Sequence, residues 1–115
     1  MMKKTKKTWK NQLDKLWSEI IHSKGYCEWC GQIGKNAHHV IGRTNYSLRW
    51  DIRNGCFLCI SCHFKAHNDP LGFMEFFKKK NPEDYKYLKE KKNQIASYTI
   101  SDYEEIYQNL LKAKQ

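Results

Sequence analysis

Two closely spaced cysteine pairs, Cys27-Glu-Trp-Cys30 and Cys59-Ile-Ser-Cys62, restrict the fold of this chain more than any other feature. Two residues between cysteines allow a tight turn to direct both sulfur atoms at a point about 2.3 Å away. Two such turns complete a tetrahedron of thiolates with no open position, so the pattern predicts a structural zinc site. An iron–sulfur cluster or redox chemistry is the alternative. We expect the fifth cysteine, Cys56, to be a buried strand residue.

The composition is typical of a small globular chain that binds a polyanion. We interpret its 115 residues as a single domain, 1–115, whose small core would gain stability from a bound metal. The formal net charge of +9 suggests nucleic acid as the partner, because each neutralised phosphate releases a counterion. Residues 1–7 are expected to form a frayed basic tail, with a DNA-contacting arm as the alternative.

The sequence also indicates the cellular compartment of the protein. No apolar stretch approaches the roughly 18 residues that span a membrane, and no apolar segment follows the N-terminal lysines as in a secretory signal. We therefore expect a cytoplasmic protein without a membrane partner. In a reducing compartment, cysteines at this spacing are metal ligands more often than disulfide partners.

Hydrophobic periodicity predicts an α+β fold with helices at both ends. Apolar residues at intervals of three and four predict a helix over residues 8–24, before Gly25. The following segment, residues 26–70, would form the metal-binding core, with strands at Ala37–Ile41 and Gly55–Leu58.

Helices are expected to fill residues 71–115. Asn81 and Pro82 form a cap and first-turn pair that would open one helix. Ser101, followed three residues later by Glu104, resembles a capping box for the last one.

Histidines form a second constellation around the cysteines. His63 and His67 are four residues apart, so on a helix they share a face at a distance that suits two imidazoles on one metal. His38 and His39 fall on a predicted strand, where neighbours point to opposite sides, so only one of them should join that metal. His22 lies outside this group and is expected to be incidental.

In this order the motifs resemble those of the HNH endonuclease family. The resemblance covers residues 27–67 and rests on Cys27-x-x-Cys30, His38-His39-Val40-Ile41, Asn54 and Leu58-Cys59-x-x-Cys62-His63-x-x-x-His67. The stretch from His39 to Asp51 is also similar to phage recombination endonucleases of the NinG/Rap type, which suggests a phage-encoded protein in a bacterial host.

The resemblance implies a ββα-metal core and a role for each polar residue. His38, His63 and His67 would bind a catalytic divalent ion, and His39 would be the general base. Asn54 would orient His39 and brace the loop between the strands. The expected activity is hydrolysis of DNA to 5′-phosphate and 3′-hydroxyl ends. The resemblance implies Mg²⁺ or Mn²⁺ as the catalytic metal, because members of the family often use these ions. Imidazole ligands instead favour Zn²⁺ or Ni²⁺.

Basic residues near this site are candidate DNA contacts. Arg43, Arg49 and Arg53 lie in the predicted loop and second strand, and arginine matches phosphate geometry with two parallel hydrogen bonds. Lys35 is a further candidate. The alternative is that these are solvated loop charges or partners of Asp51.

Besides a structural or assembly protein that shares only its fold with nucleases, two functional interpretations remain open. The first is a DNA endonuclease of low sequence specificity, or one that selects DNA structure, because the sequence contains no obvious second DNA-reading domain. The second is a non-catalytic zinc-ribbon module that binds nucleic acid. It accounts for the cysteines and the charge but leaves His38, His39 and His67 without a role.

Overall fold

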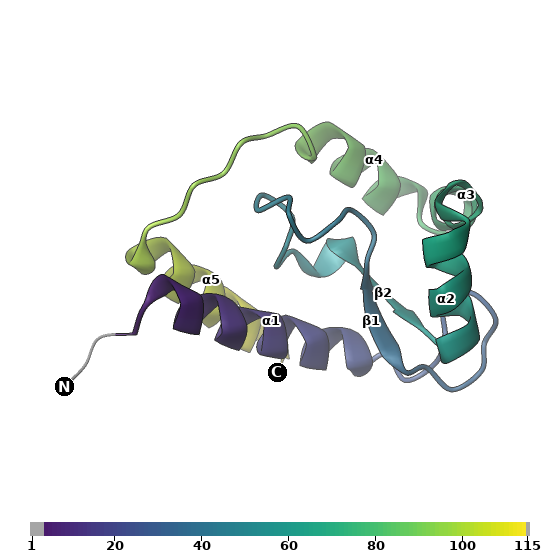
Figure 1. Ribbon diagram of the computed structural model, residues 1–115, viewed down its shortest axis with the longest axis horizontal. Helices are drawn as coiled ribbons and strands as arrows, with labels where there is room; N and C mark the ends of the chain where they lie inside the picture. Colours follow the sequence, from purple (N-terminus) through teal and green to yellow (C-terminus); the bar gives the residue numbers. More distant parts are fainter. Residues whose placement is uncertain (1–3, 115) are drawn as a thin grey trace.

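The computed structural model describes residues 4–114 and has an α+β fold, which confirms the predicted class. Within these described residues, a two-stranded antiparallel sheet lies among five helices and one 3-10 turn (Figure 1). In chain order the elements are α1 (Lys6–His22), β1 (Asn36–His39), η1 (Ile52–Asn54), β2 (Gly55–Leu58), α2 (Ile60–Asn68), α3 (Pro70–Lys80), α4 (Pro82–Lys91) and α5 (Ile100–Lys114).

The helices form two groups, on opposite faces of the sheet. Helix α1 lies against one face with α5 beside it, while α2 lies against the other face, with α3 packed on α2 and α4 packed on α3 (Figure 1). Each face has its own apolar core. The core beneath α1 includes Leu13, Trp17, Phe57, Tyr103 and Leu110. The core beneath α2 and α3 includes Cys56, Leu58, Ala66, Phe73 and Phe77.

Strand alternation explains why both faces of so small a sheet are buried. Phe57 packs towards α1, whereas its neighbours Cys56 and Leu58 pack towards α2 and α3. Helix α1 comes so close to β2 that a Cβ atom on Gly55 would lie 2.2 Å from the Ile21 side chain and 3.0 Å from that of Trp17. Only glycine fits at that position.

Two helix starts differ from the sequence-based expectation. Helix α1 begins at Lys6 rather than residue 8, because the Thr5 hydroxyl accepts a hydrogen bond from the Thr8 backbone N–H at 3.2 Å. The expected basic tail, residues 1–7, is therefore partly helical from Lys6, and residues 1–3 lie outside the described part of the chain.

The capping box of α5 also lies two residues before the predicted one. Thr99 and Asp102 cap the helix reciprocally: the Thr99 N–H donates to the Asp102 carboxylate at 2.8 Å, and the Asp102 N–H donates to the Thr99 hydroxyl at 3.2 Å. Ser101 and Glu104 lie inside the helix instead. At α4, Asn81 is the N-cap residue as expected, although its side chain makes no capping hydrogen bond.

Candidate metal centre and catalytic site

The four cysteines of the two pairs come together as predicted. The Sγ atoms of Cys27, Cys30, Cys59 and Cys62 lie within 4.8 Å of one another, and those of Cys30 and Cys59 are 3.7 Å apart. Four sulfurs about 2.3 Å from a central zinc form a tetrahedron whose edges are roughly 3.8 Å, whereas bonded sulfurs are about 2.05 Å apart. The cluster can hold a structural metal such as zinc.

Local backbone structure prepares this cluster for metal binding. Gly31 has a positive φ of 83°, which lets the first cysteine turn close with a hydrogen bond from the Gly31 N–H to the Cys27 carbonyl at 2.9 Å. Cys59 caps α2, because its sulfur accepts a hydrogen bond from the Cys62 N–H at 3.4 Å. The cluster therefore ties the first turn of α2 to the segment that follows α1.

Two thiols of the cluster, those of Cys27 and Cys62, have pKa values shifted in opposite directions. Burial alone would raise the pKa of the Cys27 thiol, but hydrogen bonds with the backbone of Cys30, Cys59 and Trp29 outweigh burial and lower that pKa to about 6. Burial and the adjacent sulfurs raise the pKa of Cys62. Cys56 is fully buried in β2, as expected, and burial raises its pKa far above the ordinary value.

Three histidines form a second potential ligand set. His38 extends from β1, and His63 and His67 extend from α2; one nitrogen from each ring lies within 4.8 Å of the other two. The Nε2 atoms of His63 and His67 are 3.0 Å apart. Two nitrogens about 2.1 Å from the same ion would be separated by roughly 3.0 to 3.4 Å, so the rings fit a shared cation.

Two of these histidine rings, His38 and His63, favour the neutral form that metal binding needs. Burial, followed by the neighbouring His63 and His67, lowers the pKa of His38 to about 4. Burial and the nearby His67 also lower the pKa of His63. A neutral imidazole offers a lone pair to a metal, so His38 and His63 can bind a cation at neutral pH without first losing a proton.

His39 points to the opposite face of the sheet, as strand alternation predicts. Its ring stacks on Trp17 of α1, with centroids 3.9 Å apart and planes 10° from parallel. Its Nε2 atom lies 2.9 Å from the Arg49 carbonyl oxygen. A carbonyl can only accept, so Nε2 carries the proton and Nδ1 keeps a free lone pair. Burial lowers the pKa of His39, and the Arg49 carbonyl partly opposes that shift.

Asn54 braces the loop between the strands but makes no hydrogen bond to His39 among the described residues, which corrects the expectation of direct orientation. The buried Asn54 amide accepts from the Ile41 N–H at 2.7 Å and donates to the Ile41 and Leu48 carbonyls at 3.0 and 3.1 Å. The Val40 N–H still donates to the Asn54 backbone carbonyl at 2.9 Å, but at Ile41 the Asn54 side chain replaces a strand partner, and β1 ends two residues earlier than predicted. Because Leu48 precedes Arg49, Asn54 holds in place the carbonyl that binds His39.

The candidate DNA contacts have different surroundings. The Arg49 guanidinium donates twice to the Asp14 carboxylate, at 3.0 and 2.7 Å, and its side chain is only 11% exposed. Arg49 is thus an internal brace, and its guanidinium is engaged by Asp14 rather than presented to a phosphate. Arg43 also binds Asp14 at 3.0 Å but remains 61% exposed.

The other two candidates lie at the surface. Arg53 pairs with Asp84 at 2.7 Å rather than with Asp51, and its side chain is 41% exposed. Its guanidinium also lies over the Tyr87 ring, 3.9 Å from the centroid. Lys35 is exposed.

Sequence reasoning missed two residues that shape the surroundings of His39. Trp17 belongs to an apolar stripe and was predicted only as core, yet it forms the wall on which the imidazole stacks. Asp14 lies on the polar side of that helix, and nothing in its local pattern indicates that it accepts from Arg49, Arg43 and the Trp50 indole N–H.

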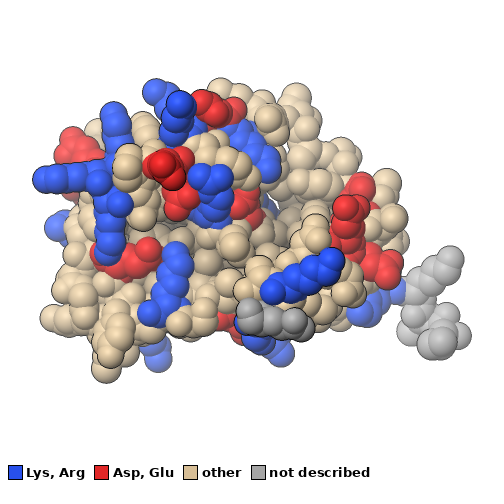
Figure 2. All heavy atoms as spheres, turned by 180° about the vertical axis from the view of Figure 1, so that it is seen from behind, with Lys and Arg blue, Asp and Glu red and all other residues tan. Residues whose placement is uncertain are grey.

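A group of exposed lysines on α3 and α4 was also missed. Figure 2 shows Lys and Arg gathered, with some acidic side chains among them, over the end of the molecule where these helices lie. The exposed lysines of this region are Lys78, Lys79, Lys80, Lys86 and Lys89. The run of three at the end of α3 is visible in the sequence and could have indicated this surface.

Comparisons with known proteins assign nothing further to these sites: no family model, curated protein or solved structure matches the chain. No helix in the described part of the chain is long and apolar enough to cross a membrane.

Proposed function

We propose that the chain is a metal-dependent DNA endonuclease of the HNH type, with a catalytic cation on His38, His63 and His67 and a general base at His39. One observation supports it above all: three imidazoles from β1 and α2 converge on one point, while the adjacent imidazole is held in one tautomer on the other strand face. A histidine cluster with only a structural role would not require His39 to be held in one tautomer on the opposite face of the strand.

The proposed base is prepared by its neighbours. The Arg49 carbonyl keeps the proton on Nε2 of His39, so Nδ1 is the atom that accepts a proton from the attacking water. The Trp17 indole restricts rotation of the ring. As the water oxygen bonds to phosphorus, the bond to the 3′-oxygen breaks and the leaving oxygen takes a proton from solvent water, so the products carry 5′-phosphate and 3′-hydroxyl ends.

The histidine set fits a catalytic rather than a closed metal site. Three nitrogens leave coordination positions open, unlike the four sulfurs of the cysteine cluster. A bound divalent cation would supply Lewis-acid stabilisation of the charge that develops on the phosphate. Imidazole ligands favour Zn²⁺, Ni²⁺ or Mn²⁺ over Mg²⁺, so all four ions belong in the assay.

Exposed basic side chains would hold the DNA backbone. Arg43 and Lys35 are exposed on the segments that flank β1, and Arg53 is exposed at η1. Contacts of this kind bind phosphates and carry little sequence information. We therefore propose low sequence specificity or selection of DNA structure.

A plasmid assay tests the proposal. Supercoiled plasmid is incubated with the wild-type chain, His39→Ala and His67→Ala, each with and without Mg²⁺, Mn²⁺, Zn²⁺ or Ni²⁺. We expect nicking by the wild type and almost none by either variant. His22→Ala is the matched control, because His22 lies outside both clusters and should leave nicking unchanged. Equal nicking by His39→Ala and the wild type would overturn the assignment of the base.

A non-catalytic zinc module that binds nucleic acid is the second candidate, favoured by the cysteine cluster and the net charge of +9. Metal analysis separates the two candidates. The module predicts one tightly held zinc ion and no further site, whereas the nuclease predicts an additional, exchangeable divalent ion that is lost in His67→Ala.

A further inference from the structure

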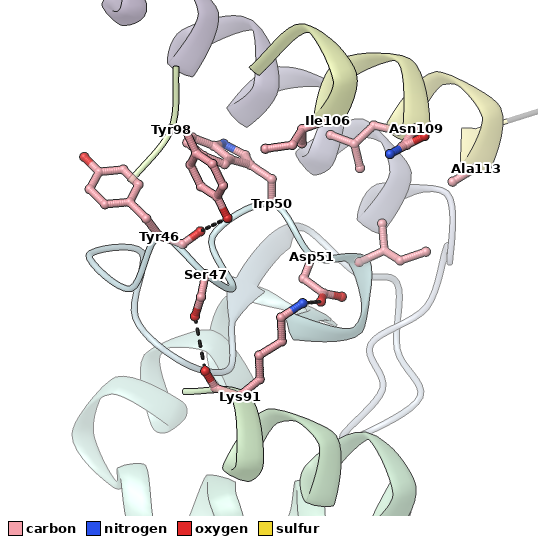
Figure 3. Close-up of a pocket in the computed structure, with 11 residues that line it drawn as sticks. Tyr46, Ser47, Trp50, Asp51, Lys91, Tyr98, Ile106, Asn109 and Ala113 are labelled. Carbon is pink, nitrogen blue, oxygen red and sulfur yellow. Dashed lines mark hydrogen bonds and ion pairs between the residues drawn. The ribbon is translucent and has the colours of Figure 1, made fainter. Parts of the chain in front are cut away.

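A cavity next to the loop that holds His39 has a lining unrelated to either metal centre. It lies between the segment that precedes β2, the end of α4 and helix α5, and its volume is about 360 Å³ (Figure 3). Volumes of roughly 300 to 1,000 Å³ are typical of pockets for small organic groups.

The lining suits a planar polar ring. Aromatic side chains form one wall: Trp50 lies 5.9 Å from Tyr46 and 6.2 Å from Tyr98 between ring centroids. Figure 3 shows these rings on one side of the cavity and Ile106, Asn109 and Ala113 of α5 on another. The Asn109 amide makes no hydrogen bond within residues 4–114, so it offers donors and an acceptor to the edge of a bound ring.

A second, smaller cavity of about 210 Å³ adjoins the first and shares Tyr46 and Tyr98 with it. Lys6 and Lys10 line this second space. The Lys10 ammonium lies 3.2 Å from the Tyr46 hydroxyl. Tyr46 and Tyr98 therefore lie between a cavity lined by aromatic rings and the Asn109 amide and a second cavity lined by two lysines. An aromatic ring and an anion carried by the same ligand would match these adjoining spaces.

The cavities are also connected to the proposed catalytic base. Trp50, which lines the large cavity, directly follows Arg49, whose carbonyl binds His39. Asp51 lines the cavity too, and its carbonyl accepts from the Trp17 indole N–H at 2.9 Å. His39 therefore contacts two residues, Arg49 and Trp17, that are each joined directly to the cavity wall.

We propose that the two cavities bind one unpaired nucleotide, with the base against Trp50 and Tyr98 and the phosphate at Lys6 and Lys10. Aromatic rings and amines together are the usual means of holding a single-stranded nucleotide, because every base has a face that stacks and every phosphate is anionic. The inference rests on the proposed function and refines it: the enzyme would prefer DNA with unpaired nucleotides. The ligand can be part of a strand or a free nucleotide.

Binding without cleavage tests the inference. Fluorescence anisotropy is measured with the His39→Ala chain and a labelled single-stranded oligodeoxythymidylate of about six nucleotides, with a fully paired duplex as comparison. Unlabelled thymidine 5′-monophosphate competes in a parallel arm. We expect single strands to bind more tightly than duplex. Competition by the mononucleotide would identify a free nucleotide as a sufficient ligand, and its failure would point to a strand.

Variants of α5 decide the location. Ala113→Trp fills the large cavity and Asn109→Leu removes the amide at similar size, and either change should weaken single-strand binding by about tenfold or more. Gln108→Trp is the matched control, because this exposed residue of α5 does not line the cavity. Unchanged single-strand binding in both cavity variants would overturn the inference, as would an equal loss of duplex binding. Since no cleavage is measured, these outcomes are independent of plasmid nicking.

Discussion

The imidazole of His39 lies parallel to the indole of Trp17, 3.9 Å away between centroids and tilted by only 10°. The same indole donates from Nε1 to the Asp51 carbonyl at 2.9 Å. Trp17, a core residue of α1, therefore contacts both the proposed base and the segment that follows Arg49. Helix α1 carries none of the four histidines of the proposed site, yet through Trp17 it forms part of the surroundings of His39.

This contact predicts that Trp17→Phe will slow DNA cleavage without abolishing metal binding. Phenylalanine keeps an aromatic ring in the core but loses the Nε1 donor and part of the stacking area, which should cost about 1 to 2 kcal/mol of stability. We expect at least a roughly tenfold lower cleavage rate, because a poorly positioned base loses much of its effect. Trp9→Phe, a buried substitution elsewhere on α1, is the control for simple destabilisation. An equal rate loss in both variants would argue against a positioning role.

The buried hydrogen bonds of Asn54 predict that replacing this residue with alanine will lower the stability of the fold strongly. Asn54→Ala removes three hydrogen bonds and leaves the Ile41 N–H and the Ile41 and Leu48 carbonyls without their partner in a buried site. Orphaned groups that water cannot reach cost about 1 to 3 kcal/mol each. Because the two bonds to Ile41 are only part-buried and the bond to Leu48 is fully buried, we expect a total of about 2 to 4 kcal/mol. Urea denaturation measures the change. Asn68→Ala, which removes one exposed bond to Phe64, should fall well below it.

The sequence was sufficient to predict the arrangement of the histidines because that arrangement depends on local periodicity. A spacing of four residues places His63 and His67 on one face of a helix, and strand alternation separates His38 from His39. The strand Gly55–Leu58 is confirmed at both ends. The convergence of the two cysteine pairs was likewise predictable, since the chemistry of the ligands requires it.

The sequence could not reveal contacts between residues distant in the chain. Asp14 lies 35 residues before Arg49, and no periodic pattern links an acidic residue on the polar face of α1 to an arginine in a loop. The sequence therefore predicts a DNA contact at Arg49, whereas the structure pairs its side chain with Asp14. The early end of β1 was unpredictable for a related reason: the Asn54 side chain, 13 residues later, takes the place of a strand partner for Ile41.

The cysteine cluster predicts that loss of zinc will also weaken the histidine site. Cys59 both supplies a ligand and caps α2, the helix that presents His63 and His67. Cys59→Ser should lose its zinc ion, measured by elemental mass spectrometry, and should bind Co²⁺ more weakly at the histidines by visible absorption. Cys56→Ala is the matched control, because Cys56 is buried but outside the cluster. Zinc retained by Cys59→Ser at the wild-type level would contradict the four-sulfur site.

Asp14 predicts a pH-dependent stability difference. Burial alone would raise its pKa, but hydrogen bonds from Arg49 and Trp50 and the charges of Arg49 and Arg43 outweigh burial and lower it. A carboxylate whose pKa is lowered on folding stabilises the folded chain above its unfolded pKa of about 3.9. This contribution disappears as the pH falls through the lower folded pKa.

At pH 7 we expect the free energy of unfolding of Asp14→Asn, measured in urea, to be about 2 kcal/mol lower than that of the wild type. The gap should close progressively below the unfolded pKa, because the wild-type side chain then becomes neutral too. Glu19→Gln, which removes an exposed ion pair with Lys114, should change stability much less at any pH. A gap for Asp14→Asn that stayed constant into the acid range would show that shape, rather than charge, gives Asp14 its effect.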